Sequence, residues 1–316
     1  MIVVAKFVGA GVVWIWGGDA CVALAGGRRC SQDEDEGDAS VPSHHNPTPA
    51  PTGMKYETRR LVNAVYSGRW NCMNDRPTIN EEELAANIAR VRSKIEEAAR
   101  KVGRSAEEIT LVAVSKTVPV ELVKIAYTLG VTDFGENRVQ DALPKIAEFH
   151  PRGMRWHMIG HLQSNKTSKV VGVFDTVQSI DSVHLAQVLN RHAREEGKIL
   201  PVLLQVNVSG EASKEGMSVS ETLELARQIA TLPCLKVHGL MTIAPLVQDP
   251  EEVRYVFRGL RELRARLQDK VADCSWNDLS MGMTDDYSVA IEEGATIVRI
   301  GRAIFGKRVY KGDSTK

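Results

Sequence analysis

Eight short apolar runs, separated by helical patterns, constrain the fold of this chain more than any other feature. Runs of this length suit strands and are too short for helices. They are residues 109–115, 131–135, 155–160, 175–180, 201–208, 237–243, 278–282 and 297–301. Eight strands with intervening helices over about 230 residues are the number and size of one (β/α)₈ barrel, so we predict a single TIM barrel of the α/β class.

The helical patterns between the runs have defined starts and ends. Asn80 and Glu83 have the spacing of a capping box, and an apolar stripe follows them at steps of three, four or seven residues. Pro119 suits the first turn of a second helix, and Gly130 suits its end. Similar stripes cross residues 183–192, 223–229 and 253–267.

Composition changes sharply before residue 80. Residues 1–27 are apolar and Gly-rich, residues 31–38 are acidic, and residues 40–53 are rich in Pro, Ser and His. We therefore predict an N-terminal extension, residues 1–79, that is largely disordered and lacks alternating strand patterns, followed by a barrel domain, residues 80–312. A targeting or anchoring role for the apolar start is the alternative, although its apolar run is too short to span a bilayer.

Charge and cysteine content exclude several classes of protein. Lys and Arg number 40, as do Asp and Glu, so no net charge attracts nucleic acid or an acidic membrane. The cysteines are odd in number and lack metal-ligand spacing: Cys21, Cys30, Cys72, Cys234 and Cys274. We expect inert thiols in a reducing compartment, the cytoplasm, with the mitochondrion as the alternative, and no metal site.

Polar residues gather where the predicted strands end. In a parallel barrel all strand C-termini open on one face, where active sites are built. The residues that we expect there are Lys116, Asn137, Ser280, Arg299, Gly301 and Arg302. Glu136 and Asp181 also follow strands, but we interpret these two as helix caps.

Lys116 ends the first apolar run and carries the clearest chemistry. An amine against apolar neighbours loses hydration, which favours its neutral form and attack on an aldehyde. The alternative is a lysine whose stem packs while its head reaches water. Barrels often bind phosphate after strands seven and eight, where Ser280 and Gly301 lie. Pyridoxal 5′-phosphate (PLP) carries both an aldehyde and a phosphate.

Six ordered blocks of the chain resemble the pyridoxal phosphate homeostasis proteins. They are Val114–Thr117, Phe134–Gln140, Trp156–Lys166, Gly239–Ile243, Leu279–Met283 and Val298–Gly306. The resemblance implies a barrel like the N-terminal domain of alanine racemase, with PLP held as a Schiff base on Lys116.

The same resemblance implies roles for the other site residues. Ser280, Gly301 and Arg302 would hold the phosphate, Asn137 would line the ring, and Arg299 would face the pyridine nitrogen. A guanidinium only donates hydrogen bonds, so Arg299 would disfavour protonation of that nitrogen and weaken the cofactor as an electron sink. A salt-bridged structural arginine is the alternative for Arg299.

These features predict a PLP-binding protein that buffers the cofactor or delivers it to PLP-dependent apoenzymes, with little turnover. One alternative is an amino-acid racemase or decarboxylase of the same barrel type, which would need an acid/base on the opposite face of the cofactor. Residues 307–316 offer only Tyr310 for that role. A second alternative is an aldolase that uses Lys116 directly on a sugar phosphate.

Overall fold

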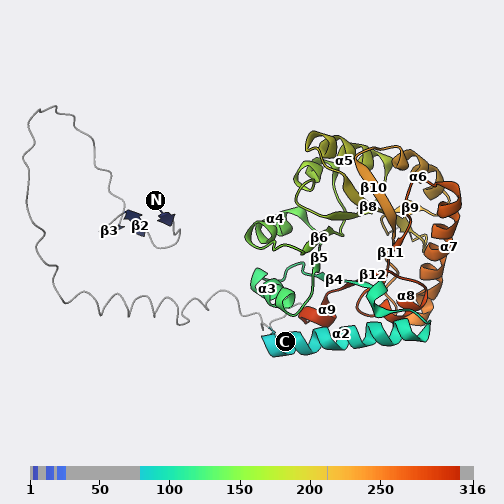
Figure 1. Ribbon diagram of the computed structural model, residues 1–316, viewed down its shortest axis with the longest axis horizontal. Helices are drawn as coiled ribbons and strands as arrows, with labels where there is room; N and C mark the ends of the chain where they lie inside the picture. The colour runs from blue at the N-terminus through green and yellow to red at the C-terminus, as the bar shows by residue number, and fades with distance from the viewer. Residues whose placement is uncertain (1–2, 6–11, 18–19, 26–78, 212, 307–316) are drawn as a thin grey trace, which may run out of the picture. The chain divides into compact units, whose positions relative to one another are not determined.

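The computed structural model describes residues 3–5, 12–17, 20–25, 79–211 and 213–306 (Figure 1). The chain divides into two compact units, Met1–Met73 and Asn74–Lys316. In the first unit, β1 (Val3–Ala5), β2 (Val12–Gly17) and β3 (Ala20–Ala25) form an antiparallel sheet in that order.

These three strands form in a part of the chain whose sequence lacks the alternating pattern of strands. Their residues are nearly all apolar, so the sequence shows no alternation there, and the strands pair antiparallel in succession. The rest of the predicted extension, with residues 31–38 and 40–53, lies outside the described residues. The boundary at residue 79 stays a prediction.

Eight parallel strands of the second unit close into a barrel. In spatial order they are β4 (Thr110–Val114), β5 (Asp133–Glu136), β6 (Arg155–Met158), β7 (Thr176–Ile180), β8 (Leu200–Asn207), β10 (Leu235–Met241), β11 (Asp278–Ser280) and β12 (Ile297–Ile300). Each strand pairs with the next, and β12 pairs with β4 to close the ring. All eight predicted strands and the predicted barrel are confirmed. A short strand, β9 (Met217–Ser218), extends the edge of β8.

Helices cover the outside of the strand ring (Figure 1). They are α2 (Glu81–Lys101), α3 (Val120–Thr128), α4 (Val139–Glu148), α5 (Val183–Glu195), α6 (Thr222–Ala230), α7 (Arg254–Lys270), α8 (Tyr287–Glu292) and α9 (Arg302–Phe305). Three 3₁₀ helices complete the set: η1 (Ala106–Glu108), η2 (Ser164–Lys169) and η3 (Pro250–Val253). Asn80 caps α2, accepting a hydrogen bond from the Glu83 amide at 2.8 Å, so the predicted capping box is confirmed.

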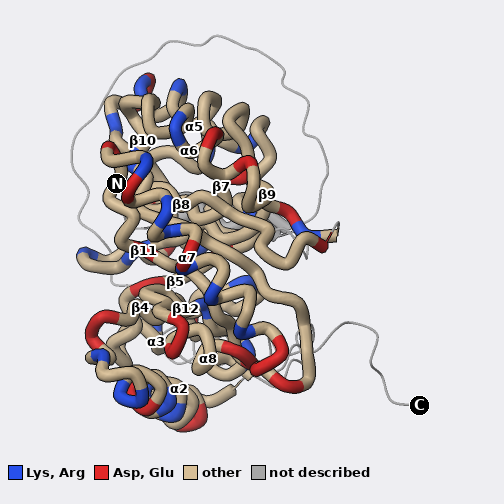
Figure 2. Tube along the Cα trace, turned by 90° about the vertical axis from the view of Figure 1, so that its right-hand side faces the viewer, with Lys and Arg blue, Asp and Glu red and all other residues tan. Residues whose placement is uncertain are grey.

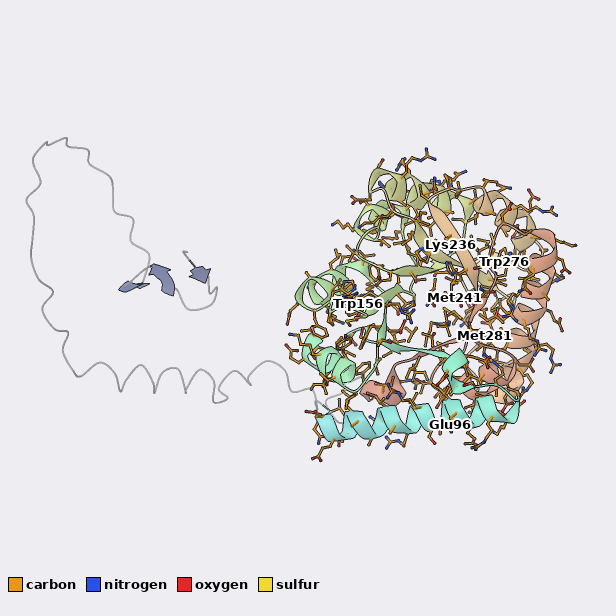
Figure 3. The ribbon with its side chains drawn as sticks, viewed as in Figure 1. Glu96, Trp156, Lys236, Met241, Trp276 and Met281 are labelled. Atoms are coloured by element: carbon orange, nitrogen blue, oxygen red, sulfur yellow. The ribbon has the colours of Figure 1, made fainter. Side chains whose placement is uncertain are left out.

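The core has two layers because successive strand residues face opposite sides. The outer layer lies between strands and helices; there the fully buried Trp156 meets Phe134 with ring centroids 5.6 Å apart. Inside the ring lies a small apolar cluster that includes Leu203 and Met241 (Figure 3). Several of the remaining inward-facing strand residues are polar, and some of them belong to the candidate site.

Charge is mixed over the surface. Figure 2 shows Lys and Arg interspersed with Asp and Glu along α2. Within the described part of the chain, no helix combines the length and apolar character needed to cross a membrane.

Candidate functional site

The six predicted site residues come from four adjacent strands. The barrel order places β11, β12, β4 and β5 side by side. Ser280 is the last residue of β11, and Arg299, Gly301 and Arg302 lie in or just after β12. Lys116 and Asn137 follow β4 and β5. Because the strands are parallel, their C-terminal ends bring these residues to one face.

Lys116 lies at the apex of a tight turn. The Val118 amide donates to the Ser115 carbonyl at 2.9 Å, which places Lys116 and Thr117 at the centre of the turn. Thr117 adopts φ 64°, a left-handed conformation that costs a β-branched residue about 1–3 kcal/mol. The Lys116 side chain is half-buried. A strained turn therefore presents this amine at the end of β4.

A buried group of three residues fixes the base of that turn. Ser115 Oγ donates to Glu136 Oε1 at 2.7 Å, and Lys145 Nζ donates to the same oxygen at 2.8 Å. Lys145 Nζ also donates to the Ser115 carbonyl at 2.7 Å. Glu136 is fully buried, and Arg138 precedes α4 as its N-cap, so the interpretation of Glu136 as a helix cap is wrong.

Asn137 offers a buried acceptor. Its Oδ1 atom is inaccessible to solvent and has no hydrogen-bond partner within the described residues. Gly160 packs directly on its backbone, where a Cβ would lie 2.7 Å from Asn137 Cα. A buried acceptor without a partner is costly unless a ligand or water satisfies it.

Arg299 is the charged group at the centre of the site. It is 4% exposed, and its Nη1 and Nη2 donate to Ser280 Oγ at 2.7 Å and to the Thr242 carbonyl at 2.8 Å. Burial lowers the pKa of Arg299 to about 10, and the charge of Asp286 acts in the opposite direction. The guanidinium therefore stays protonated at neutral pH.

Arg299 makes no salt bridge with any carboxylate in the part of the chain that the structure describes. The alternative of a salt-bridged structural arginine is therefore not what the structure has. A guanidinium has five N–H groups. The two described hydrogen bonds use only two of them.

The three residues predicted to hold phosphate are not converged on one point. Ser280 Oγ faces the barrel interior and donates to Gln178 Oε1 at 2.6 Å. Arg302 is exposed and pairs with Asp285. Gly301 lies against β4, where a Cβ would come within 3.4 Å of Val114.

A second polar cluster lies after β6, β7 and β8. His161 Nδ1 is 3.3 Å from both Asp181 Oδ2 and Glu215 Oε2. Ser182, whose Oγ accepts from the Leu185 amide, is the N-cap of α5, so the interpretation of Asp181 as a helix cap is wrong. No three His, Cys, Asp or Glu residues of the described segments have the arrangement of a metal site.

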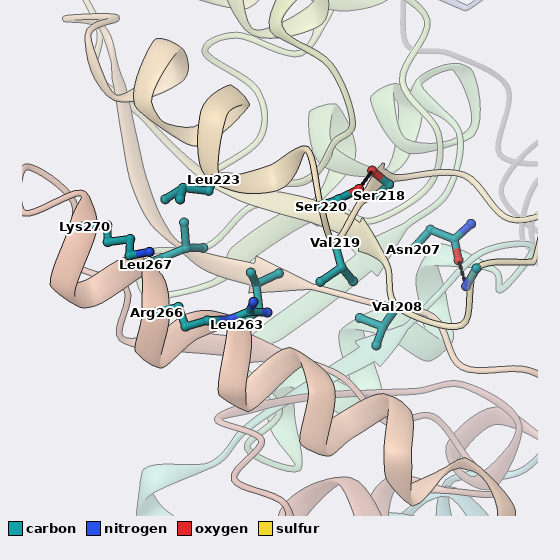
Figure 4. Close-up of a pocket in the computed structure, with 11 residues that line it drawn as sticks. Asn207, Val208, Ser218, Val219, Ser220, Leu223, Leu263, Arg266, Leu267 and Lys270 are labelled. Carbon is teal, nitrogen blue, oxygen red and sulfur yellow. Dashed lines mark hydrogen bonds between the residues drawn. The ribbon is translucent and has the colours of Figure 1, made fainter.

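A cavity of about 560 Å³ lies between the loop after β8 and α7 (Figure 4). Leu223, Leu263 and Leu267 line it, together with Arg266 and Lys270. None of the six predicted site residues lines this cavity.

Comparison with known proteins assigns the chain to a family. A family model described as the N-terminal domain of alanine racemase matches residues 79–309. The pyridoxal phosphate homeostasis protein of Vibrio alginolyticus is 46% identical over 231 residues, which cover 72% of this chain and 98% of that protein. The protein of that name from Escherichia coli K12 is 44% identical over 234 residues, covering 72% and 98%.

The chain belongs to the pyridoxal phosphate homeostasis protein family. The resemblance carried by the six sequence blocks is thereby confirmed. PipY of Synechococcus elongatus PCC7942, solved with PLP bound, is similar to the barrel: identity is 36%, the TM-score is 0.63, and 71% of this chain and 100% of PipY are covered.

Alanine racemase of Corynebacterium glutamicum shares the fold, with 14% identity, a TM-score of 0.57, and 74% of this chain and 64% of the racemase covered. The alanine-racemase-like barrel predicted from the sequence is confirmed. At this identity the likeness concerns the fold alone.

Sequence reasoning missed the buried polar residues Asp133, His157 and Gln178 and the partly buried Lys145. A signal was present, since His157 and Gln178 are each preceded by a buried apolar residue in a short strand and are themselves buried. A polar residue in the middle of a buried strand needs a partner, and the partner indicates a network.

Proposed function

We propose that this protein binds PLP at the C-terminal face of the barrel and buffers the cofactor or delivers it to PLP-dependent apoenzymes. The observation that supports this most is a buried, donor-rich guanidinium, Arg299, on the strand next to the one that presents Lys116. The fit is supported by Asn137 Oδ1, which is buried and has no hydrogen-bond partner among the residues that the structure describes. PipY, a similar barrel solved with PLP, adds support.

In this proposal Lys116 holds the cofactor covalently. Its amine condenses with the PLP aldehyde, forming a C=N bond and releasing one water molecule. The turn at Ser115–Val118, tied to Glu136 and Lys145, keeps the amine at the strand end. Hydrolysis of the same bond releases the aldehyde, so storage is reversible.

Arg299 would face the pyridine nitrogen, and Asn137 would line the ring. Ser280, Gly301 and Arg302 would hold the phosphate. Arg302 can reach a phosphate only by leaving Asp285, and since both side chains of that pair are about half exposed, the cost is small.

The same residues favour binding of PLP over its use in catalysis. PLP supplies an electron sink for amino-acid chemistry, and that sink is strongest when the ring nitrogen is protonated. A guanidinium that only donates keeps this nitrogen unprotonated. We therefore propose little or no catalysis, with a PLP-dependent racemase or decarboxylase as the enzyme alternative.

Absorption spectroscopy and cofactor transfer test the proposal. Adding PLP to the purified protein should produce a visible band, whereas a Schiff-base aldolase would show no cofactor absorbance. The loaded protein should then activate a PLP-dependent apoenzyme faster than PLP dissociates into bulk solvent. Absence of a visible band contradicts PLP binding, and transfer limited by dissociation contradicts delivery.

A further inference from the structure

Five buried side chains form a hydrogen-bonded chain across the barrel interior, which we call the barrel relay. Its members are Arg299, Ser280, Gln178, His157 and Asp133. Each is at most 5% exposed. The relay joins the neighbouring strands β12 and β11 at one end and β7, β6 and β5 at the other, and it crosses the ring between β11 and β7.

The contacts of the relay are short. Arg299 Nη1 lies 2.7 Å from Ser280 Oγ, which lies 2.6 Å from Gln178 Oε1. Gln178 Nε2 lies 3.0 Å from His157 Nδ1. His157 Nε2 lies 2.8 Å from Asp133 Oδ1.

The two ends of the relay fix the direction of the hydrogen bonds that they make. Arg299 can only donate, so Ser280 Oγ accepts from it and gives its own proton to Gln178. At the other end Asp133 is a carboxylate: burial alone would raise its pKa, but hydrogen bonds from His157, Arg155 and Thr132 lower the pKa to about 2.

The donors and acceptors in the middle of the relay are set by Asp133 and by the orientation of the Gln178 amide. Because Asp133 accepts, His157 Nε2 carries a proton and donates to it. Gln178 Oε1 accepts from Ser280, so Gln178 Nε2 faces His157 Nδ1 as the donor. Both polar atoms of the Gln178 amide are therefore hydrogen-bonded. In this orientation Gln178 Oε1 accepts the Ser280 proton, so the Ser280 oxygen remains available to accept from Arg299.

We propose that Gln178 is a positioning residue for Arg299. By accepting the Ser280 proton, it keeps the Ser280 oxygen as an acceptor, and Ser280 with the Thr242 carbonyl then holds two N–H groups of Arg299. The remaining N–H groups are fixed in direction and select a ligand with a hydrogen-bond acceptor, an unprotonated pyridine nitrogen. This inference rests on the proposed binding of PLP.

A matched pair of ligands and variants tests the inference. The ligands are PLP and its analogue with a C–H group in place of the ring nitrogen, which has the same aldehyde and phosphate. Gln178→Leu removes both relay contacts. Gln205→Leu is the control, because Gln205 is also a buried strand glutamine but donates to the Glu215 carbonyl outside the relay.

Gln178→Leu should weaken PLP about tenfold, the scale of one hydrogen bond to a charged group, and shift its visible absorption maximum. Binding of the carbon analogue should change less than about twofold. Gln205→Leu should leave the ratio of the two affinities as in the wild type. Gln178→Glu, which retains an acceptor for Ser280, should restore most of the preference for PLP.

Other outcomes separate the two proposals. If Gln178→Leu weakens both ligands equally, Gln178 is structural and the positioning inference is wrong, while PLP binding stands. If the wild-type protein binds neither ligand, the proposed function fails, and the inference fails with it. Gln178→Met fills a similar volume and replaces Gln178→Leu if that variant does not fold.

Discussion

Arg299 Nη1 donates to Ser280 Oγ at 2.7 Å, joining two neighbouring strands inside the barrel. The residue expected to face the cofactor ring and a residue expected to hold its phosphate are therefore bonded to each other. Ser280 Oγ donates its proton to Gln178 Oε1. Ser280 can donate to a phosphate only if that bond is exchanged.

Ser280→Ala should weaken PLP binding by about 0.5–3 kcal/mol, the range for a hydrogen bond to a charged group. Unphosphorylated pyridoxal should lose less, because both aldehydes lose the Ser280 support for Arg299 but only PLP also loses a phosphate contact. Titration calorimetry with both aldehydes measures the difference. Equal losses for PLP and pyridoxal would mean that Ser280 does not contact the phosphate.

Sequence patterns were sufficient to predict the strands but not the hydrogen bonds in the interior of the barrel. Each strand is a short apolar run, and few compact folds are compatible with short apolar runs that alternate with helical stripes. The relay was not predicted because His157 and Gln178 acquire their partners from strands that are distant in sequence. The direction of a surface side chain such as Arg302 depends on tertiary contacts with Asp285.

Asp133→Asn should destabilise the protein in a pH-dependent way. The pKa of Asp133 falls from the ordinary 3.8 to about 2 in the folded protein, so its carboxylate stabilises the fold above pH 3.8. This contribution, about 2 kcal/mol, is lost as pH falls through 2. Urea unfolding at several pH values should therefore show a larger free energy of unfolding for the wild type than for the variant, and this difference should decrease between about pH 4 and pH 2. A difference independent of pH contradicts the account.

A chain that begins at Arg76 should fold and bind PLP with unchanged affinity. It retains Ile79, which packs on the core, and the capping box of α2. Circular dichroism and PLP titration against the full-length chain provide the measurement. Loss of the fold would show that the barrel depends on earlier residues.

The loaded protein should leave amino acids unchanged. In the proposed site Arg299 faces the ring nitrogen as a pure donor and would weaken the electron sink, so Cα–H bonds should not be activated. Incubation with L- or D-alanine, serine or lysine in deuterated water, followed by mass spectrometry, measures Cα exchange. Exchange, racemisation or decarboxylation at about 1 s⁻¹ or faster, the low end for enzymes, would support an enzyme instead.

The central claim is that Lys116 is the residue that holds PLP, and borohydride reduction tests it most directly. Reduction converts the C=N bond into a stable amine, and peptide mapping then locates the phosphopyridoxyl group. We predict that the label lies on Lys116, and that Lys116→Ala abolishes it while the circular dichroism spectrum is unchanged. A label mainly on Lys166 or Lys214, or one that persists in Lys116→Ala, would contradict the account.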